Sequence, residues 1–147
     1  RFFTKALRDL KMLNIDEPFM KLYTQGMVLK NGEVMSKSKG NVVDPRDIIK
    51  IYGIDTLRTF ILSVASPEKE WEWDDSGIEG IFKFLNKFYY LLENVNKEDD
   101  EIVESKLNKL IKKVTLDIEE FRFNNWIVSI IEFSDYFKKR NYSKGTL

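Results

Sequence analysis

The chain has 147 residues, which suits one ordinary domain or two small ones. Hydrophobic residues make up 43% and aromatic residues 14%, enough for a packed core, while 24 basic and 24 acidic residues leave no net charge. Cysteine and histidine are both absent, which excludes disulfides, thiolate metal sites and histidine-based acid–base catalysis by this chain. We therefore expect no metal site and no bound cofactor.

No apolar run approaches the roughly 20 residues that cross a bilayer, so we expect no membrane partner and a cytoplasmic protein. The chain opens on Arg1-Phe2-Phe3 without Met, and apolar residues continue at helical spacing to about residue 12. This opening predicts a helix that lies inside a longer protein. Glu17-Pro18 interrupts the pattern, because a residue before proline is pushed out of the helical region.

A short hairpin is the next predicted element. Residues 26–35 read as two strands joined at Asn31-Gly32, a dipeptide that tolerates the positive φ angles of a tight turn. Residues 36–41 are small, polar or basic and have no apolar anchor, which predicts a loop.

Two helices are predicted after this loop. Asp44 is the expected cap of the first, Pro45 suits its first position, and Gly53 is the expected stop. Asp55 is the expected cap of the second, which continues to Val64.

Long amphipathic helices dominate from residue 76. Ser76 has the spacing of a capping box with Glu79, and Asn124 or Asn125 is the expected cap of the last helix. Three apolar stripes are expected to bury one another as a bundle, with inward residues that include Phe82, Leu85, Leu110, Ile111, Ile127 and Ile130. The predicted fold is therefore mainly α with a small β-hairpin: an α/β part in residues 1–70 and a helical bundle in residues 71–147.

Lysines and serines in the 36–41 loop suggest an anion site, because backbone amides, a nearby helix N-terminus and ammonium groups can hold phosphate oxygens. The loop is not a Walker A sequence, since Gly40 is the one glycine near it. A solvated surface loop remains the alternative, because charge runs are usually solvated faces.

The KMSKS signature of class I aminoacyl-tRNA synthetases resembles the string Val34-Met35-Ser36-Lys37-Ser38, which continues as Lys39-Gly40-Asn41. Two further segments are similar to leucyl-tRNA synthetase in particular. They are Thr24–Val28 and the Pro67–Trp73 segment that leads to Gly77-Ile78-Glu79-Gly80. One departure is Val34, where the signature has its first lysine. It removes one positive charge beside the triphosphate.

The resemblance implies activation of leucine by ATP, with Mg²⁺ brought by ATP, and transfer of leucine to tRNA(Leu). It implies that Lys37 is the catalytic contact to the leaving phosphates. The ATP-binding residues that it implies are Met35, Ser36, Lys37, Ser38, Lys39, Gly40 and Asn41. Met35 is expected to anchor the loop rather than to touch the ligand.

The family's second ATP signature, HIGH, requires histidine, and this chain has none. The remainder of the synthetase chain is therefore an expected partner, and these residues alone are expected to be an inactive part of the enzyme. Residues 1–70 resemble the end of the catalytic domain with its stem-contact-like part, and residues 71–147 the start of the anticodon-binding helices. The alternatives are a non-catalytic tRNA-binding or scaffold protein that retains this segment, and the isoleucyl or valyl relative.

One basic cluster near the C-terminus is a candidate tRNA contact: Lys138, Lys139, Arg140 and Lys144. Cations that complement a helix dipole are the alternative for these residues. Trp71 and Trp73 are predicted to pack between the two parts of the chain rather than to stack on bases. Arg58 is expected to brace the part that carries the loop.

Overall fold

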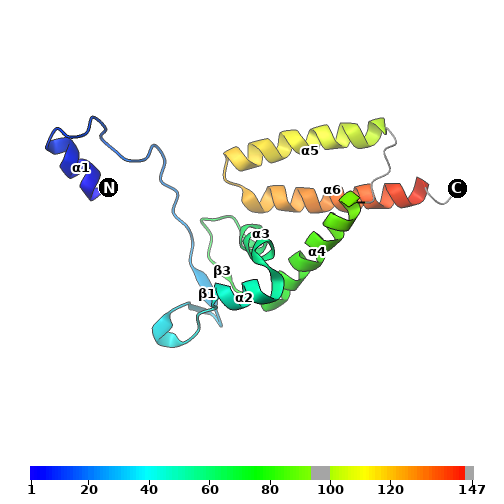
Figure 1. Ribbon diagram of the computed structural model, residues 1–147, viewed down its shortest axis with the longest axis horizontal. Helices are drawn as coiled ribbons and strands as arrows, with labels where there is room; N and C mark the ends of the chain where they lie inside the picture. The colour runs from blue at the N-terminus through cyan, green and yellow to red at the C-terminus, as the bar shows by residue number, and fades with distance from the viewer. Residues whose placement is uncertain (94–99, 145–147) are drawn as a thin grey trace.

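The computed structural model describes residues 1–93 and 100–144, the last four of these by their backbone alone. Its elements follow the expected class, mainly α with a small sheet (Figure 1). In chain order they are α1 (Phe2–Asp9), β1 (Val28–Lys30), β2 (Glu33–Val34), the 3₁₀ helix η1 (Lys37–Lys39), α2 (Pro45–Tyr52), α3 (Ile54–Val64), β3 (Trp71–Glu72), α4 (Asp75–Glu93), α5 (Glu101–Glu119) and α6 (Phe123–Lys144). Among the described residues, no helix combines the length and the apolar content that a bilayer crossing requires.

The sheet has the order β2-β1-β3. The expected hairpin is confirmed, since β1 and β2 pair antiparallel with Leu29 opposite Val34. The structure adds β3, which pairs parallel with β1 and places Trp71 beside Val28. This pairing fixes the hairpin to a distant part of the chain. The sequence did not predict β3, because a strand of two residues is too short to show alternation.

The core lies where α3 meets α4, around Leu57, Phe60, Ile78 and Ile81. Both tryptophans pack edge-on against the Phe60 ring, with centroid distances of 5.9 Å for Trp71 and 5.4 Å for Trp73. Edge-to-face packing of this kind suits the ring quadrupoles. The prediction that these tryptophans are packing residues is confirmed.

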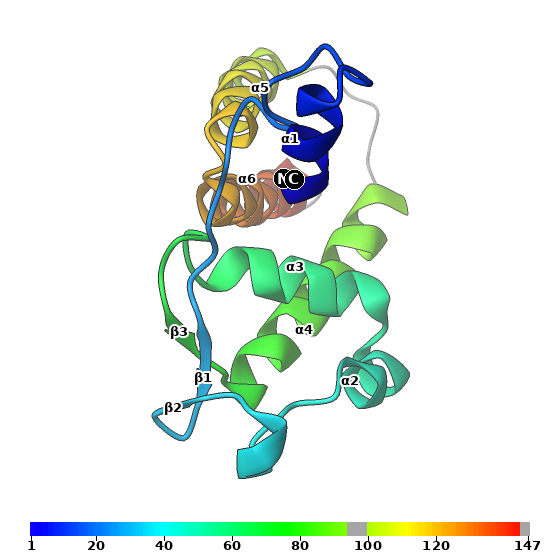
Figure 2. The same ribbon diagram turned by 90° about the vertical axis from the view of Figure 1, so that its left-hand side faces the viewer.

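The long helices form the expected helical bundle, but α4, α5 and α6 do not pack on one another equally, and α4 meets α6 only weakly. Instead α5 and α6 form an antiparallel pair, α6 also packs against α3, and α3 is the main partner of α4 (Figures 1 and 2). The physical reason is α3, whose buried Leu57 and Phe60 require cover from α4. The helix α3 therefore links α4 to α6.

Helix starts agree with the sequence only in part. Asp44 caps α2 by accepting a hydrogen bond from the Arg46 amide, and Gly53 ends α2, both as expected. The Asp55 cap is wrong, because α3 starts directly after Gly53. The Ser76 cap is also wrong, because Asp74 caps α4 instead. The Asp74 carboxylate accepts a hydrogen bond from the Ser76 amide at 2.9 Å.

The predicted cap of α6, Asn124 or Asn125, would start the helix two or three residues late, since α6 begins at Phe123. The face assignment of α5 also needs correction. Ile111 is 55% exposed, whereas the charged Asp117 is buried. Asp117 is buried because Lys113 and Arg122 pair with it at 3.0 Å and 2.9 Å.

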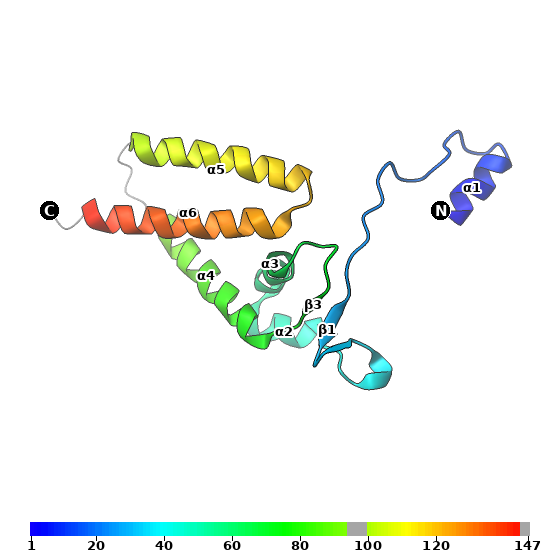
Figure 3. The same ribbon diagram turned by 180° about the vertical axis from the view of Figure 1, so that it is seen from behind.

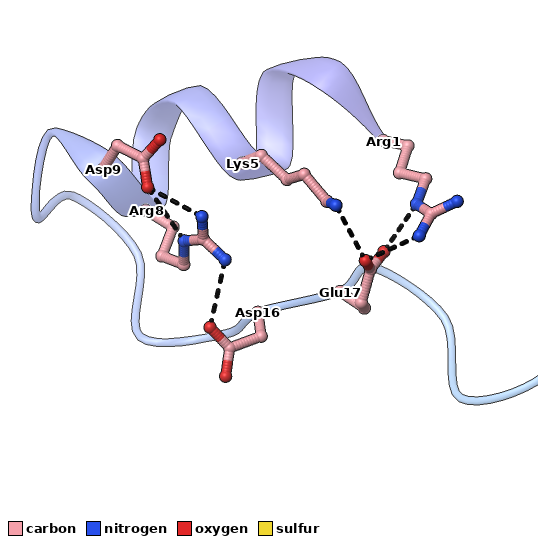
Figure 4. A network of polar contacts seen from close by, with 6 residues as sticks. All are labelled: Arg1, Lys5, Arg8, Asp9, Asp16 and Glu17. Carbon is pink, nitrogen blue, oxygen red and sulfur yellow. Dashed lines mark hydrogen bonds and ion pairs between the residues drawn. The ribbon is translucent and has the colours of Figure 1, made fainter.

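The helix α1 stands apart from the other helices at the end of an extended arm, and it ends at Asp9 rather than near residue 12 (Figure 3). Charged side chains fasten it to the chain that follows it (Figure 4). Glu17 accepts two hydrogen bonds from the Arg1 guanidinium and pairs with Lys5, while Arg8 reaches Asp16. The apolar side chains Phe2, Phe3 and Leu10 stay exposed.

Candidate functional site

The candidate ATP loop, residues 35–41, leaves the sheet directly after β2. Its supporting turn is Asn31-Gly32, where both residues adopt positive φ, 58° and 75°. The Gly32 amide donates to the Glu72 carboxylate at 3.2 Å, which ties the turn to β3. The base of the loop is thus held from two sides, by the hairpin and by the parallel strand.

The loop itself contains a single 3₁₀ turn over Lys37–Lys39 that ends at Gly40 with φ 68°. The Lys39 amide donates to the Ser36 carbonyl at 3.1 Å, and the Ser36 and Ser38 hydroxyls lie 2.9 Å apart. Met35 is half-buried and its amide donates to the Val28 carbonyl, which extends the hairpin pairing. The loop has a definite backbone conformation in which the side chains of Lys37, Ser38 and Lys39 are exposed.

Asn41 connects this loop to both strands of the hairpin. Its Oδ1 accepts a hydrogen bond from the Ser36 amide at 2.8 Å. Its Nδ2 donates to the Val34 carbonyl at 3.3 Å and to the Lys30 carbonyl at 3.5 Å. The sequence predicted a backbone role for Asn41; the side-chain role depends on the hairpin closing, and no local pattern signals it.

The lysines of the loop differ in their surroundings. The Lys39 ammonium pairs with the Glu33 carboxylate at 2.9 Å, and both side chains are more than half exposed. The Lys37 side chain is exposed and has no hydrogen bond or ion pair within residues 1–93 and 100–144. Lys37 is therefore the loop cation that is free to meet an anion, while Lys39 has first to leave Glu33.

The N-terminus of α2 does not add to an anion site, contrary to the sequence expectation. The Asp44 carboxylate already occupies it, accepting from the Arg46 amide at 2.9 Å and from the Arg46 guanidinium. Hydrogen bonds from Arg46 lower the pKa of Asp44 to about 2. A carboxylate that stays ionised there repels phosphate, so the candidate anion ligands are those of the loop.

The C-terminal basic cluster is divided by the structure. Arg140 pairs with Asp100, the residue that caps α5, at 2.5 Å and 3.2 Å. Lys138 and Lys139 are exposed on the same helix, and the Lys144 side chain lies outside the described residues. Arg140 therefore holds α6 to the start of α5, a structural contact that the sequence pattern did not indicate.

A groove of about 490 Å³ between α5 and α6 carries basic residues that the sequence analysis missed, Lys106, Lys109 and Lys113. Lys106 lies 3.7 Å from the centroid of the Tyr136 ring, a cation–π contact. Lys113 donates to Ser129 at 2.6 Å and pairs with Asp117. Burial opposes ionisation of Asp117, but Lys113 and Arg122 together lower its pKa. The signal available in the sequence was the helical spacing of Lys106, Lys109 and Lys113, which places them on one face of α5.

The Arg58 side chain is exposed on α3 and makes no hydrogen bond or ion pair with any residue in the described ranges. The expectation that it braces the loop-bearing part is therefore wrong. In the same ranges no cluster of His, Cys, Asp or Glu has the size of a metal site.

Comparison with known proteins agrees with this geometry. The family model described as tRNA synthetases class I (I, L, M and V) matches residues 2–74. The leucine–tRNA ligase of Thermotoga petrophila is 48% identical over 151 residues, and that of Campylobacter hominis is 51% identical over 146 residues. These alignments cover 92% and 90% of this chain and 18% of each relative. The chain thus spans less than a fifth of their length.

A solved structure shares the fold. The crystal structure of the ternary complex of Agrobacterium radiobacter LeuRS with tRNA and LeuAMS matches with a TM-score of 0.84 and 31% identity, over 97% of this chain and 21% of that one. The relatives named here are leucine enzymes, which does not favour the isoleucyl or valyl alternative. The chain belongs to the class I aminoacyl-tRNA synthetases and, within them, to the leucyl-tRNA synthetase family.

Proposed function

We propose that this chain supplies the ATP loop and a tRNA-facing helical region of a leucine–tRNA ligase. The enzyme activates leucine with Mg²⁺-bound ATP and transfers it to tRNA(Leu) in the cytoplasm. The observation that carries the proposal is an exposed, unpaired lysine, Lys37, on a loop whose base is fixed by a hairpin and a parallel strand. A flexible ammonium on a fixed base suits recognition of a charged, transient group.

The chemistry requires no nucleophile from the protein. A carboxylate oxygen of leucine forms the new bond to the α-phosphorus of ATP, and the bond from that phosphorus to the bridging oxygen breaks. Pyrophosphate leaves with the electron pair of the broken bond. Catalysis is then positioning and stabilisation of the charge that develops on the leaving group.

Each loop residue has a proposed role in this step. Lys37 contacts the leaving phosphates in the transition state. Ser36, Ser38 and the amides of Gly40 and Asn41 supply neutral donors, while Met35 anchors the loop. Lys39 adds a weaker charge, because Glu33 already neutralises part of it.

The remaining segments of a synthetase complete the site in this proposal. We assign residues 1–70 to the end of the catalytic domain and residues 71–147 to the start of the anticodon-binding helices. The tRNA in the Agrobacterium complex supports tRNA(Leu) as the partner. Lys139 is the stronger candidate for a phosphate contact in the C-terminal cluster, since it is exposed whereas Arg140 pairs with Asp100; Lys138 and Lys144 complete the cluster.

Lys37→Ala in the complete synthetase is the test. Leucyl-adenylate formation should fall about 10²–10³-fold, the usual effect of losing one preorganised transition-state contact, while leucine binding changes little. Pre-steady-state adenylate formation measures the first quantity and equilibrium leucine binding the second.

Lys50→Ala is the matched control, because Lys50 lies on the neighbouring α2 and its pair with Asp47 is exposed. It should keep the full rate of adenylate formation. A Lys37→Ala enzyme within about tenfold of wild type, or about 1.4 kcal/mol, would favour a non-catalytic tRNA-binding protein that retains this segment.

A further inference from the structure

The Asn41 side chain joins the backbone of the loop to the backbone of the hairpin. It is the one side chain in the described ranges that bonds to the backbone of residues 35–40, through the Ser36 amide. The other hydrogen bonds of this stretch of backbone have backbone partners. The side chain is partly buried, and its Oδ1 and Nδ2 atoms both have partners. A side-chain amide used at both ends is a bridge between two backbone segments.

The position of this bridge determines what it controls. Ser36 immediately precedes Lys37, so the orientation of the Ser36 peptide sets the direction in which the Lys37 side chain leaves the backbone. The carbonyls of Lys30 and Val34 belong to β1 and β2. Asn41 therefore fixes the start of the loop relative to the sheet on which the loop stands.

Without this bridge, the exposed Lys39–Glu33 ion pair would be the remaining described contact between the side chains of the 3₁₀ turn and the sheet. The Lys39 and Gly40 amides donate to the Ser36 and Lys37 carbonyls at 3.1 Å and 3.3 Å, which shapes the 3₁₀ turn but does not attach it to the sheet. A turn that pivots on its base has to be ordered when ATP binds, at a cost in conformational entropy.

We propose that Asn41 is a positioning residue, which acts through Lys37 by holding the Ser36 peptide against the β1–β2 hairpin. This rests on the proposed function, because it assigns Asn41 a part in delivering Lys37 to the leaving phosphates. The side chain itself does not touch ATP. Its effect on rate is therefore conditional on the presence of the lysine.

A double-mutant cycle in the complete synthetase tests this dependence. Asn41→Ala should lower the rate constant of adenylate formation about tenfold to a hundredfold, the scale on which ~1 Å misplacement of a catalytic group acts. The KM for leucine should not change. In a Lys37→Ala background the same substitution should change the rate less than about twofold, since interacting sites are non-additive.

Asn86→Ala is the matched control. Its Nδ2 also donates to a backbone carbonyl, that of Phe82 at 2.8 Å, but on the exposed side of α4. This variant should keep the wild-type rate in both backgrounds. This control separates the effect of removing an exposed asparagine from the effect of removing the Asn41 bridge.

Amide hydrogen exchange on the 147-residue chain gives an independent readout. In Asn41→Ala the Ser36 amide should exchange about twofold to tenfold faster, the change that losing one hydrogen bond produces. The Met35 amide, which donates to the Val28 carbonyl, should keep its protection. Faster exchange at both positions would mean that the hairpin itself opens, and would overturn the assignment.

Two kinetic outcomes would also overturn it: a wild-type rate in Asn41→Ala, or an equal loss in the presence and absence of Lys37. A large drop in melting temperature would make Asn41 a general stabilising residue and would have the same consequence. If Lys37→Ala itself keeps the full rate, the proposed function fails, whereas an impaired Lys37→Ala beside a normal Asn41→Ala rejects this inference alone.

Discussion

Burial separates two isoleucines that look equivalent in the sequence. Ile127 on α6 is 2% exposed, whereas Ile111 on α5 is 55% exposed. Both belong to apolar stripes at helical spacing, and such a stripe locates a face only to within about one residue on either side. The inward positions of α5 are therefore a property of its packing against α6.

Ile127→Ala should lower the free energy of unfolding by about 2–5 kcal/mol, because the truncated side chain leaves a cavity in a packed region. Urea denaturation followed by far-UV circular dichroism measures this loss. Ile111→Ala is the matched substitution on an exposed site and should change stability by less than about 0.5 kcal/mol. Equal losses for the two variants would mean that α5 turns a different face toward α6.

At the scale of elements, the predictions that depend on local signals agree with the structure better than those that depend on tertiary contacts. The α2 boundaries were correct because Asp44, Pro45 and Gly53 act on the adjacent backbone. The start of α4 was wrong because an equally good cap stood nearby: Asp74 precedes Ser76 by two residues and takes the role. The start of α3 was wrong because that helix begins after Gly53 without a side-chain cap. A sequence indicates that a helix starts in a region, while packing selects among the available caps.

The α1 element is stabilised by charge and should respond to acid. Hydrogen bonds from Arg1 and Lys5 lower the pKa of Glu17 from 4.5 to about 2. A carboxylate with a lowered pKa contributes stability that is complete above the unfolded value and lost as the pH falls through the folded value. The attachment of α1 to the arm should therefore persist at pH 5 and disappear as the pH falls through about 2.

Carbon-13 NMR of the Glu17 carboxyl gives its titration midpoint, and nitrogen-15 relaxation of α1 reports its order. Glu17→Gln serves as the control, because it should show at pH 5 the mobility that wild type reaches only in strong acid. A midpoint for Glu17 near its ordinary value of 4.5 would contradict the pairing.

At the scale of the whole molecule, α3 determines the arrangement. It follows α2 after Gly53, covers α4 through Phe60 and meets α6 on another side. The sequence predicted the helices and the hairpin but not these pairings, because contacts between distant segments leave no periodic pattern. The candidate site followed the same division: Lys37 was predicted from the motif, while the Glu33–Lys39 pair and the Asn41 bridge required the folded hairpin.

The 147-residue chain should fold but should not activate leucine or charge tRNA. It lacks histidine, and so lacks the HIGH half of the site that the family uses. Exposed contacts from Lys37 and Lys39 to ATP should be worth about 1 kcal/mol or less each, and salt should weaken them. Leucine-dependent ATP–pyrophosphate exchange checks this prediction, and a signal from the pure chain would contradict it.

The parallel pairing of β1 with β3 has a mechanical consequence. The Trp71 amide donates to Met27 and the Trp73 amide to Leu29, so tension that enters through the arm and leaves through α4 loads these bonds together, in shear. An antiparallel pair pulled from one end would open one bond at a time. The β1–β3 bonds therefore carry a pull on the arm directly to β3 and α4, and β2 and the 35–41 loop lie outside this path of load.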